Sequence, residues 1–123
     1  MSWTTIFFAG AAAALFLIWK YSGNVSAGKA KALLQQGALV VDVRSPGEFA
    51  AGHLRGAINL PLDRIAAAHP LPGGLQDKQR VILLHCQGGM RSRQAKSLLR
   101  SMGYANAFNL GSYQRAAGIV RNK

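Results

Sequence analysis

The sequence predicts an α/β domain with a mainly parallel sheet of four to five strands and helices on both faces, preceded by one N-terminal transmembrane helix. Two observations lead to this prediction. Short apolar runs alternate with helical patterns across residues 26–120, as in parallel α/β sheets. Residues 2–19 are uncharged and mostly apolar. We therefore expect an anchor at residues 3–20, a linker at 21–25 and one domain at 26–120.

The first half of the domain predicts a helix and two strands. Residues 26–36 have apolar side chains at helical spacing and end before Gly37, which terminates the helix. Residues 38–43 form a continuous apolar run with one acid near its end, which is typical of a buried strand. A shorter strand is expected at residues 57–60, where Pro61 stops it.

A short helix is predicted between these two strands. Ser45 and Glu48 have the spacing of a capping box, and Pro46 occupies the first helical position. We expect this helix to end by Gly52.

The second half continues the alternation of strands and helices. The expected elements are a helical turn or two at 63–68, a Pro/Gly-rich loop at 69–78 that includes His69, a strand at 81–84, a helix at 92–102, a strand at 105–110 and a final helix to about residue 117. Ligands of such sheets bind beyond the carboxyl ends of the strands. The predicted site therefore lies where the end of strand 38–43 meets the end of strand 81–84.

Cys86, the only cysteine, stands just past the apolar run 81–84 and just before a helix. A thiol at a strand-to-helix turn lies near backbone N–H groups and a helix N-terminus, which stabilise a thiolate. We interpret Cys86 as a nucleophile, although an isolated cysteine can also be an inert core residue. A single cysteine forms no intrachain disulfide and suits a reducing compartment.

The residues after Cys86 suggest a loop that binds anions. Small residues allow several N–H groups to turn inward, and an arginine has a fork suited to an oxyanion. The predicted substrate-binding residues are Gln87, Gly88, Gly89, Met90 and Arg91. The two glycines could instead serve only the turn. Further along the helix, Arg93, Lys96 and Arg100 are expected on a solvated face.

Spacing distinguishes two reactions of a cysteine. A cysteine phosphatase places five residues between its cysteine and its arginine, which makes room for a phosphate. Here four residues separate Cys86 from Arg91. The shorter loop favours sulfur chemistry and disfavours a phosphatase.

Two blocks of sequence resemble the rhodanese domain, and specifically the small single-domain sulfurtransferases. The first block is VVDVRSPGEFAAGHLRGAINLPL, and the second is HCQGGMRS. The resemblance covers about residues 26–118 and leaves the apolar segment outside it. It implies a rhodanese-like fold and an active loop at residues 86–91.

The resemblance implies a two-step sulfur transfer without a cofactor or metal. The Cys86 thiolate attacks a donor such as thiosulfate, sulfite leaves, and a persulfide remains on Cys86. Arg91 would bind the anionic donor. The persulfide then passes its sulfur to cyanide or to a thiol on another molecule, because the chain has no second cysteine. The alternative is a rhodanese-like binding or sulfur-relay module with little turnover of its own.

Several polar residues correspond to the scaffold of the family. The supporting residues are Asp42, Arg44, Glu48, His53 and Ser92. We expect the first four to make caps and buried hydrogen bonds that tie the first block to the loop. His85 should point to the opposite face of its strand from its neighbours and have a structural role.

Two positions depart from the pattern of the family. Many rhodaneses place arginine directly after the cysteine, where this chain has Gln87, so the donor preference is open. Residues 111–113, Gly-Ser-Tyr, stand where a Gly-Gly pair and a tryptophan are common, so the pocket wall is expected to differ.

The N-terminal segment predicts a single-pass anchor in the inner membrane. Its length fits a bilayer, and Trp3 and Trp19 stand where interfacial aromatics occur. Lys20 follows the span and no charged side chain precedes it, which places the domain in the cytoplasm. The alternatives are a buried amphipathic helix or a cleaved signal peptide with a periplasmic domain.

The chain is strongly basic, with 15 Lys/Arg against 4 Asp/Glu. This excess suits anionic lipid or small anionic substrates. No zinc-ligand spacing or nucleic-acid-binding motif is present in the sequence, so we expect neither a metal nor a nucleic-acid partner.

Overall fold

The computed structural model describes residues 2–67 and 71–121, and for residues 16–22 it describes the backbone alone. His69 lies outside the described residues. The helices are α1 (Trp3–Ser22), α2 (Ala27–Gln35), α3 (Pro46–Ala51), α4 (Leu62–Ala66), α5 (Met90–Ser101) and α6 (Tyr113–Arg121), with a 3-10 helix at Gly73–Leu75. The strands are β1 (Leu39–Asp42), β2 (Ile58–Asn59), β3 (Ile82–His85) and β4 (Ala107–Gly111).

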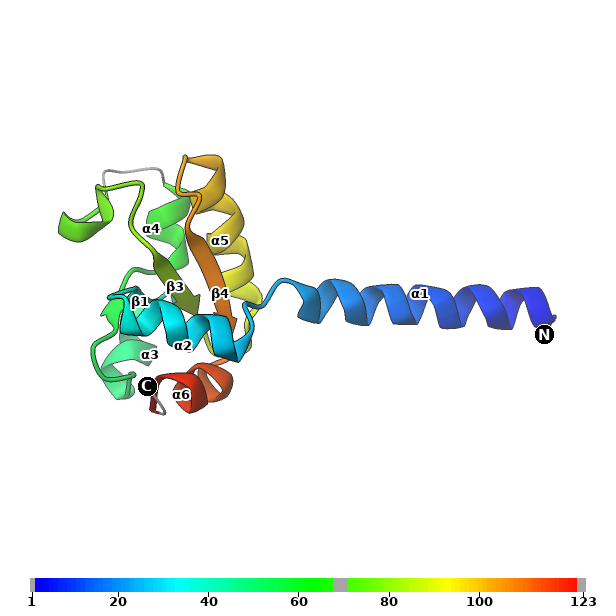
Figure 1. The fold of residues 1–123 in the computed structure, drawn as a ribbon. Coiled ribbons are helices and arrows are strands. Elements are labelled where there is room, and N and C mark those ends of the chain that lie inside the picture. The colour runs from blue at the N-terminus through cyan, green and yellow to red at the C-terminus, as the bar shows by residue number, and fades with distance from the viewer. Residues whose placement is uncertain (1, 68–70, 122–123) are drawn as a thin grey trace.

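The four strands form one parallel sheet in the order β2-β1-β3-β4. Helices α4 and α5 pack together on one face, while α2 and α6 lie together on the other (Figure 1). The predicted α/β class, the parallel sheet and the helices on both faces are therefore confirmed.

The central strand β3 supplies the core on both faces of the sheet. All four of its residues are buried, which explains its continuous apolar sequence. Ile82 and Leu84 pack on the α4–α5 side, and Leu83 packs on the α2–α6 side. This alternation follows from the two-residue period of a strand.

Local sequence signals account for most element boundaries. The capping box of α3 is present, with Ser45 and Glu48 bonded reciprocally. The prediction for α5 was wrong at its start, because the helix begins at Met90 and not at residue 92. Gly89 has φ +98°, a left-handed conformation that glycine adopts without strain, and the chain turns there into the helix. Arg91 therefore lies in the first turn of α5.

Helix α1 extends away from the domain (Figure 1). Its large apolar side chains are exposed, including Trp3, Phe7 and Phe8 at 88%, 72% and 68%. Within the described residues, no helix has the length and apolar character needed to cross a bilayer. The predicted transmembrane helix is therefore not supported, although a helix does form where the anchor was expected.

Candidate functional site

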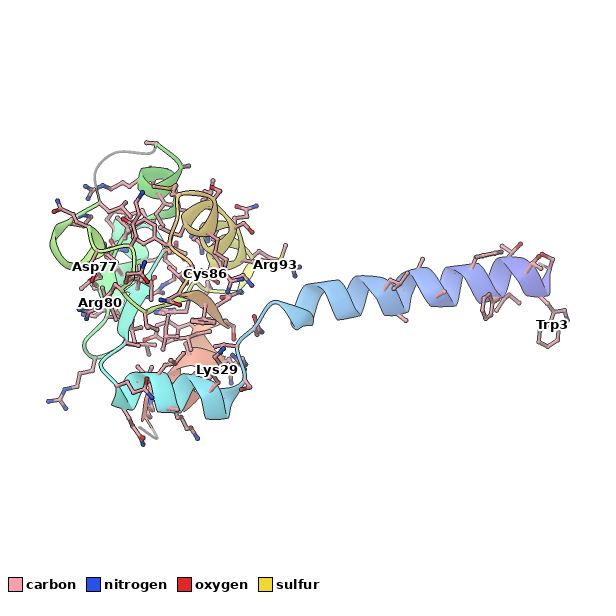
Figure 2. The ribbon with its side chains drawn as sticks, turned by 45° about the horizontal axis from the view of Figure 1, so that its top comes forward. Trp3, Lys29, Asp77, Arg80, Cys86 and Arg93 are labelled. Carbon is pink, nitrogen blue, oxygen red and sulfur yellow. The ribbon has the colours of Figure 1, made fainter. Side chains whose placement is uncertain are left out.

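Cys86 lies directly after β3, at the carboxyl end of the central strand. Its side chain is buried, with 1% of its surface exposed, and Figure 2 shows it inside the domain, far from Trp3 at the tip of α1. The thiol therefore occupies the position at which ligands of parallel sheets bind.

The thiol sulfur has two hydrogen-bond partners at the start of α5. The Gly89 N–H donates to Cys86 Sγ at 2.9 Å, and the Ser92 hydroxyl donates at 3.5 Å. The same hydroxyl lies 3.1 Å from the Gly89 carbonyl oxygen. A backbone N–H that points at a sulfur can stabilise negative charge that develops there during a reaction.

The junction between β4 and α6 fixes the other side of the loop. The Cys86 N–H donates to the Gly111 carbonyl at 3.3 Å, and the Tyr113 N–H donates to the Gln87 carbonyl at 3.2 Å. Gly88 and Ser112 form an isolated antiparallel bridge. These contacts hold the loop in place by backbone bonds.

Asn109 adds a buried side-chain contact to the same junction. Its Oδ1 accepts from the Gly111 N–H at 2.8 Å, and its Nδ2 donates to the Gly89 carbonyl at 3.3 Å. One amide therefore bonds both the end of β4 and the loop that holds Cys86.

Arg91 is engaged by Glu48 in a bidentate ion pair. Its two terminal nitrogens donate to Glu48 Oε1 and Oε2 at 2.6 and 3.0 Å. The hydrogen bonds from Arg91 lower the pKa of Glu48 to about 2, and the same contact raises the pKa of Arg91. The pair is partly exposed, with 39% and 34% of the two side chains accessible. The donor-binding role of Arg91 stays a prediction, and in this structure its guanidinium is bonded to the Glu48 carboxylate.

Arg44 connects the first sequence block to the loop. Its guanidinium donates to the buried Asp42 carboxylate, with Nη2 2.9 Å from Oδ2, and to the Gly52 carbonyl at 2.7 Å. Its other terminal nitrogen donates to Gln87 Oε1 at 3.3 Å. The hydrogen bond to Asp42 raises the pKa of Arg44. The distances agree with the expected scaffold role of this pair.

His85 is buried beneath the loop. Its Nδ1 lies 3.4 Å from the Cys86 carbonyl, and its Nε2 lies 3.8 Å from Asp42 Oδ2. Burial lowers the pKa of His85, which keeps the ring neutral. The Tyr113 ring packs edge-on against it. These surroundings are those of a structural residue.

The remaining predicted residues lie at the edges of the site. His53 is exposed, stacks on the Phe49 ring and bonds the Phe49 carbonyl through Nδ1 at 2.9 Å. Met90 is 43% exposed beside the loop. Among the described residues, no cluster of three or more His, Cys, Asp and Glu side chains could hold a metal.

Two of the three basic residues expected on a solvated face of α5 also bond to other segments of the chain. Arg100 is exposed, as expected, whereas Lys96 is half-buried. Lys96 donates to the Gly23 carbonyl at 3.1 Å, and Arg100 donates to the Ala107 carbonyl at 3.0 Å. Both residues therefore tie α5 to other segments, and burial lowers the pKa of Lys96.

Sequence reasoning missed three residues near the loop. Asn24, Asn109 and Arg115 lie in the linker, in β4 and in α6, far from Cys86 along the chain. The first and third line a cavity against the loop, and the second bonds it. A polar residue in an otherwise apolar strand was the available signal for Asn109.

The site thus holds a buried cysteine sulfur beside a backbone N–H at the carboxyl end of a parallel sheet. This class of site is suited to cysteine-based sulfur transfer. Residues 26–116 match the Rhodanese-like domain family. The chain belongs to this family, and the resemblance found in the sequence is confirmed.

Curated relatives include sulfurtransferases. The chain is 38% identical over 81 residues to the thiosulfate sulfurtransferase PspE of Escherichia coli, covering 63% of this chain and 72% of that one. It is 36% identical over 103 residues to the human thiosulfate:glutathione sulfurtransferase, covering 74% and 90%. Relatives named tRNA uridine(34) hydroxylase also match, but the match to the protein of Erwinia tasmaniensis, at 32% identity, spans 59% of this chain and 21% of that one.

Solved structures agree with these relatives. The human single-domain sulfurtransferase TSTD1 superposes with a TM-score of 0.66 at 31% identity, covering 78% of this chain and 96% of that one. A rhodanese with anions from Escherichia coli gives a TM-score of 0.53 at 36% identity, covering 64% and 91%. Relatives of this kind support a sulfurtransferase activity.

Proposed function

We propose that this protein is a thiosulfate-type sulfurtransferase that carries sulfane sulfur as a persulfide on Cys86. The observation that supports this most directly is the Gly89 N–H, which donates to Cys86 Sγ at 2.9 Å. The donor is part of the backbone at the start of α5, so it is already aimed before a substrate binds. Such preorganised donors stabilise the charge of a thiolate and of a persulfide.

The reaction runs in two displacements. The Cys86 thiolate attacks the outer sulfur of thiosulfate, a bond forms between the two sulfurs, and sulfite leaves with the electron pair of the broken S–S bond. An external thiolate or cyanide then attacks the outer sulfur of the persulfide, and the electron pair returns to Cys86 Sγ. Cys86 is the only cysteine of the chain, so the acceptor is another molecule.

Loading with thiosulfate tests this function. Intact-mass measurement of the full chain should show one added sulfur atom, and Cys86→Ser should show none. An unmodified wild-type protein would contradict the proposal.

The near-complete burial of Cys86 favours a second candidate, a sulfur-relay or binding module with little turnover of its own. The sulfurtransferase and the relay module differ in the kinetics of sulfite release. An enzyme releases sulfite continuously when cyanide is present, whereas a relay module releases about one equivalent and then waits for a specific partner. A phosphatase is disfavoured by loop length, and turnover of an aryl phosphate that depends on Cys86 would revive it.

We further propose that α1 attaches the domain to the inner membrane, with the domain on the cytoplasmic side. Exposed side chains such as Ile6, Phe7 and Phe8 support attachment to lipid, because contiguous apolar surface is costly in water. Fractionation of cells should find the wild type with the membranes and the Phe7→Asp/Phe8→Asp variant in the supernatant. Recovery of the wild type in the supernatant would contradict this proposal.

A further inference from the structure

A cavity of about 340 Å³ lies against the Cys86 loop, and its lining does not include Glu48. Residues 88–90 of the loop form one wall, residues 111–112 form another, and Asn24 and Arg115 complete the lining. Gly89 belongs to this wall and also donates to Cys86 Sγ. The cavity therefore adjoins the group that holds the reactive sulfur.

The walls of the cavity are already ordered by hydrogen bonds. Arg115 donates to the Leu110 carbonyl at 2.5 Å and to the Val25 carbonyl at 2.6 Å. The Val25 N–H donates to the Asn109 carbonyl at 2.9 Å, which pins the segment after α1 to β4. A preformed site of this kind loses little conformational entropy when a ligand binds.

Glycine is required where two of the walls meet. Gly111 has φ +96°, and a Cβ on it would stand 3.0 Å from Asn24 Nδ2. Gly89 has φ +98°, and a Cβ on it would stand 3.4 Å from the Gly111 carbonyl carbon. The cavity depends on this close approach of backbone to backbone.

The charged side chain in the lining of the cavity is Arg115. The chain has four acidic residues, and none of them lines the cavity. Asp42 and Glu48 are bonded to Arg44 and Arg91 instead. Arg115 donates to carbonyl oxygens, and no ion pair joins it to an acidic side chain within the described residues. The lining therefore favours a ligand with a negative group.

Size and position indicate which sulfur substrate the cavity fits. A volume near 340 Å³ is that of a pocket for a small organic molecule, which is larger than a thiosulfate ion needs. We propose that this cavity binds the carboxylate of a small thiol acceptor, with Arg115 and Asn24 as its recognition residues. The inference rests on the proposed sulfurtransferase function and assigns the acceptor to this side of the loop.

Transfer of sulfur to the acceptor needs no oxidant. The bound thiol loses its proton to solvent, and its thiolate attacks the outer sulfur of the Cys86 persulfide. A bond forms between the acceptor sulfur and the outer sulfur, and the bond from the outer sulfur to Cys86 Sγ breaks. The products are an acceptor persulfide and the Cys86 thiolate.

The test compares two small thiols as acceptors for the full-length protein loaded with thiosulfate. Thioglycolate carries a carboxylate, and mercaptoethanol of similar size is neutral. The measured quantity is the ratio of kcat/KM for thioglycolate to kcat/KM for mercaptoethanol. Asn24→Asp places a like charge beside the carboxylate and should lower this ratio roughly tenfold, and Arg115→Gln should lower it by a similar factor.

Arg121→Gln is the matched control, because it removes the same charge from a different hollow, next to His53. Its ratio should equal that of the wild type. A wild-type ratio in both Asn24→Asp and Arg115→Gln would overturn the inference, as would an equal drop in Arg121→Gln. Failure of the wild type to take up sulfur at all would instead overturn the proposed function.

Discussion

The two flanks of the Cys86 loop are built differently. On one flank, Arg91 is matched by Glu48 in a bidentate pair at 2.6 and 3.0 Å. On the other, Arg115 bonds to carbonyl oxygens and lines a cavity without a carboxylate. The charge of Arg91 is balanced by a carboxylate, whereas the carbonyl oxygens bonded to Arg115 are neutral and leave its positive charge to attract an anionic ligand. The first flank is therefore held by an ion pair, and the second carries the cavity proposed for the acceptor.

The largest expected effect comes from closing the cavity flank at Gly89. Gly89→Ala forces a side chain into φ +98° and brings its Cβ to 3.4 Å from the Gly111 carbonyl carbon. We expect the free energy of unfolding to fall by about 2–3 kcal/mol and sulfite release in the first turnover to slow. Denaturant unfolding and a stopped-flow sulfite assay measure the two effects.

Gly88→Ala is the matched control for this substitution. Nothing lies within 4 Å of a Cβ at Gly88, and its φ lies outside the left-handed region. Its loss of stability should be clearly smaller. If the two variants lost the same free energy of unfolding, the close approach of the loop to Gly111 would not contribute to stability.

Asn109→Ala should have the next largest effect. The substitution leaves the Gly111 N–H without the side-chain oxygen that accepts its bond at 2.8 Å in the interior. An unpaired buried donor costs about 1–2 kcal/mol of unfolding free energy. Thermal unfolding measures it, and a change well below this range would mean that another group replaces the amide.

These contacts also show what the sequence could predict. Short apolar runs bounded by turn residues predicted the four strands, and the spacing of Ser45 and Glu48 predicted the capping box of α3. Both signals depend on residues that are close together in the chain. The place of Cys86 at the end of β3 followed from the same reasoning.

The rest of the site depends on contacts between distant residues. The partner of Arg91 is Glu48, 43 residues earlier, and no local pattern connects them. Arg115 and Asn24 meet at the cavity only because residues 23–25 are pinned to the end of β4. Helix α5 begins at Met90 because Gly89 adopts a left-handed backbone conformation. The sequence alone does not show which of the two adjacent glycines, Gly88 or Gly89, adopts it.

Ser45→Ala tests the ion-paired flank through the cap of α3. The Ser45 hydroxyl accepts from the Glu48 N–H at 3.2 Å and donates to Glu48 Oε1 at 3.1 Å. Loss of this cap should lower the free energy of unfolding by about 1 kcal/mol. Ser101→Ala removes a hydroxyl that bonds to the Leu98 carbonyl of its own helix, and it should lower the free energy of unfolding by roughly a few tenths of a kcal/mol, as ordinary surface changes do. Equal losses would contradict the capping role.

The smallest effect is the pH dependence of the Glu48–Arg91 pair. The pKa of Glu48 is lowered from 4.5 to about 2, so its stabilising contribution is complete above pH 4.5 and is lost as pH falls toward 2. The stability difference between wild type and Glu48→Gln should therefore shrink over this window. Because the pair is partly exposed, added salt should also reduce the difference at neutral pH. A difference that stays constant from pH 7 to pH 2 would contradict the lowered pKa.

The proposed reaction requires that Cys86 carries the transferred sulfur. Intact-mass measurement of the full-length protein after incubation with thiosulfate, followed by peptide mapping, shows whether it does. We expect one added sulfur atom, located on Cys86 and removed by cyanide or a thiol, and no addition to Cys86→Ser. An unmodified Cys86 in folded wild-type protein, or sulfur retained by Cys86→Ser, would show that Cys86 does not carry the sulfur.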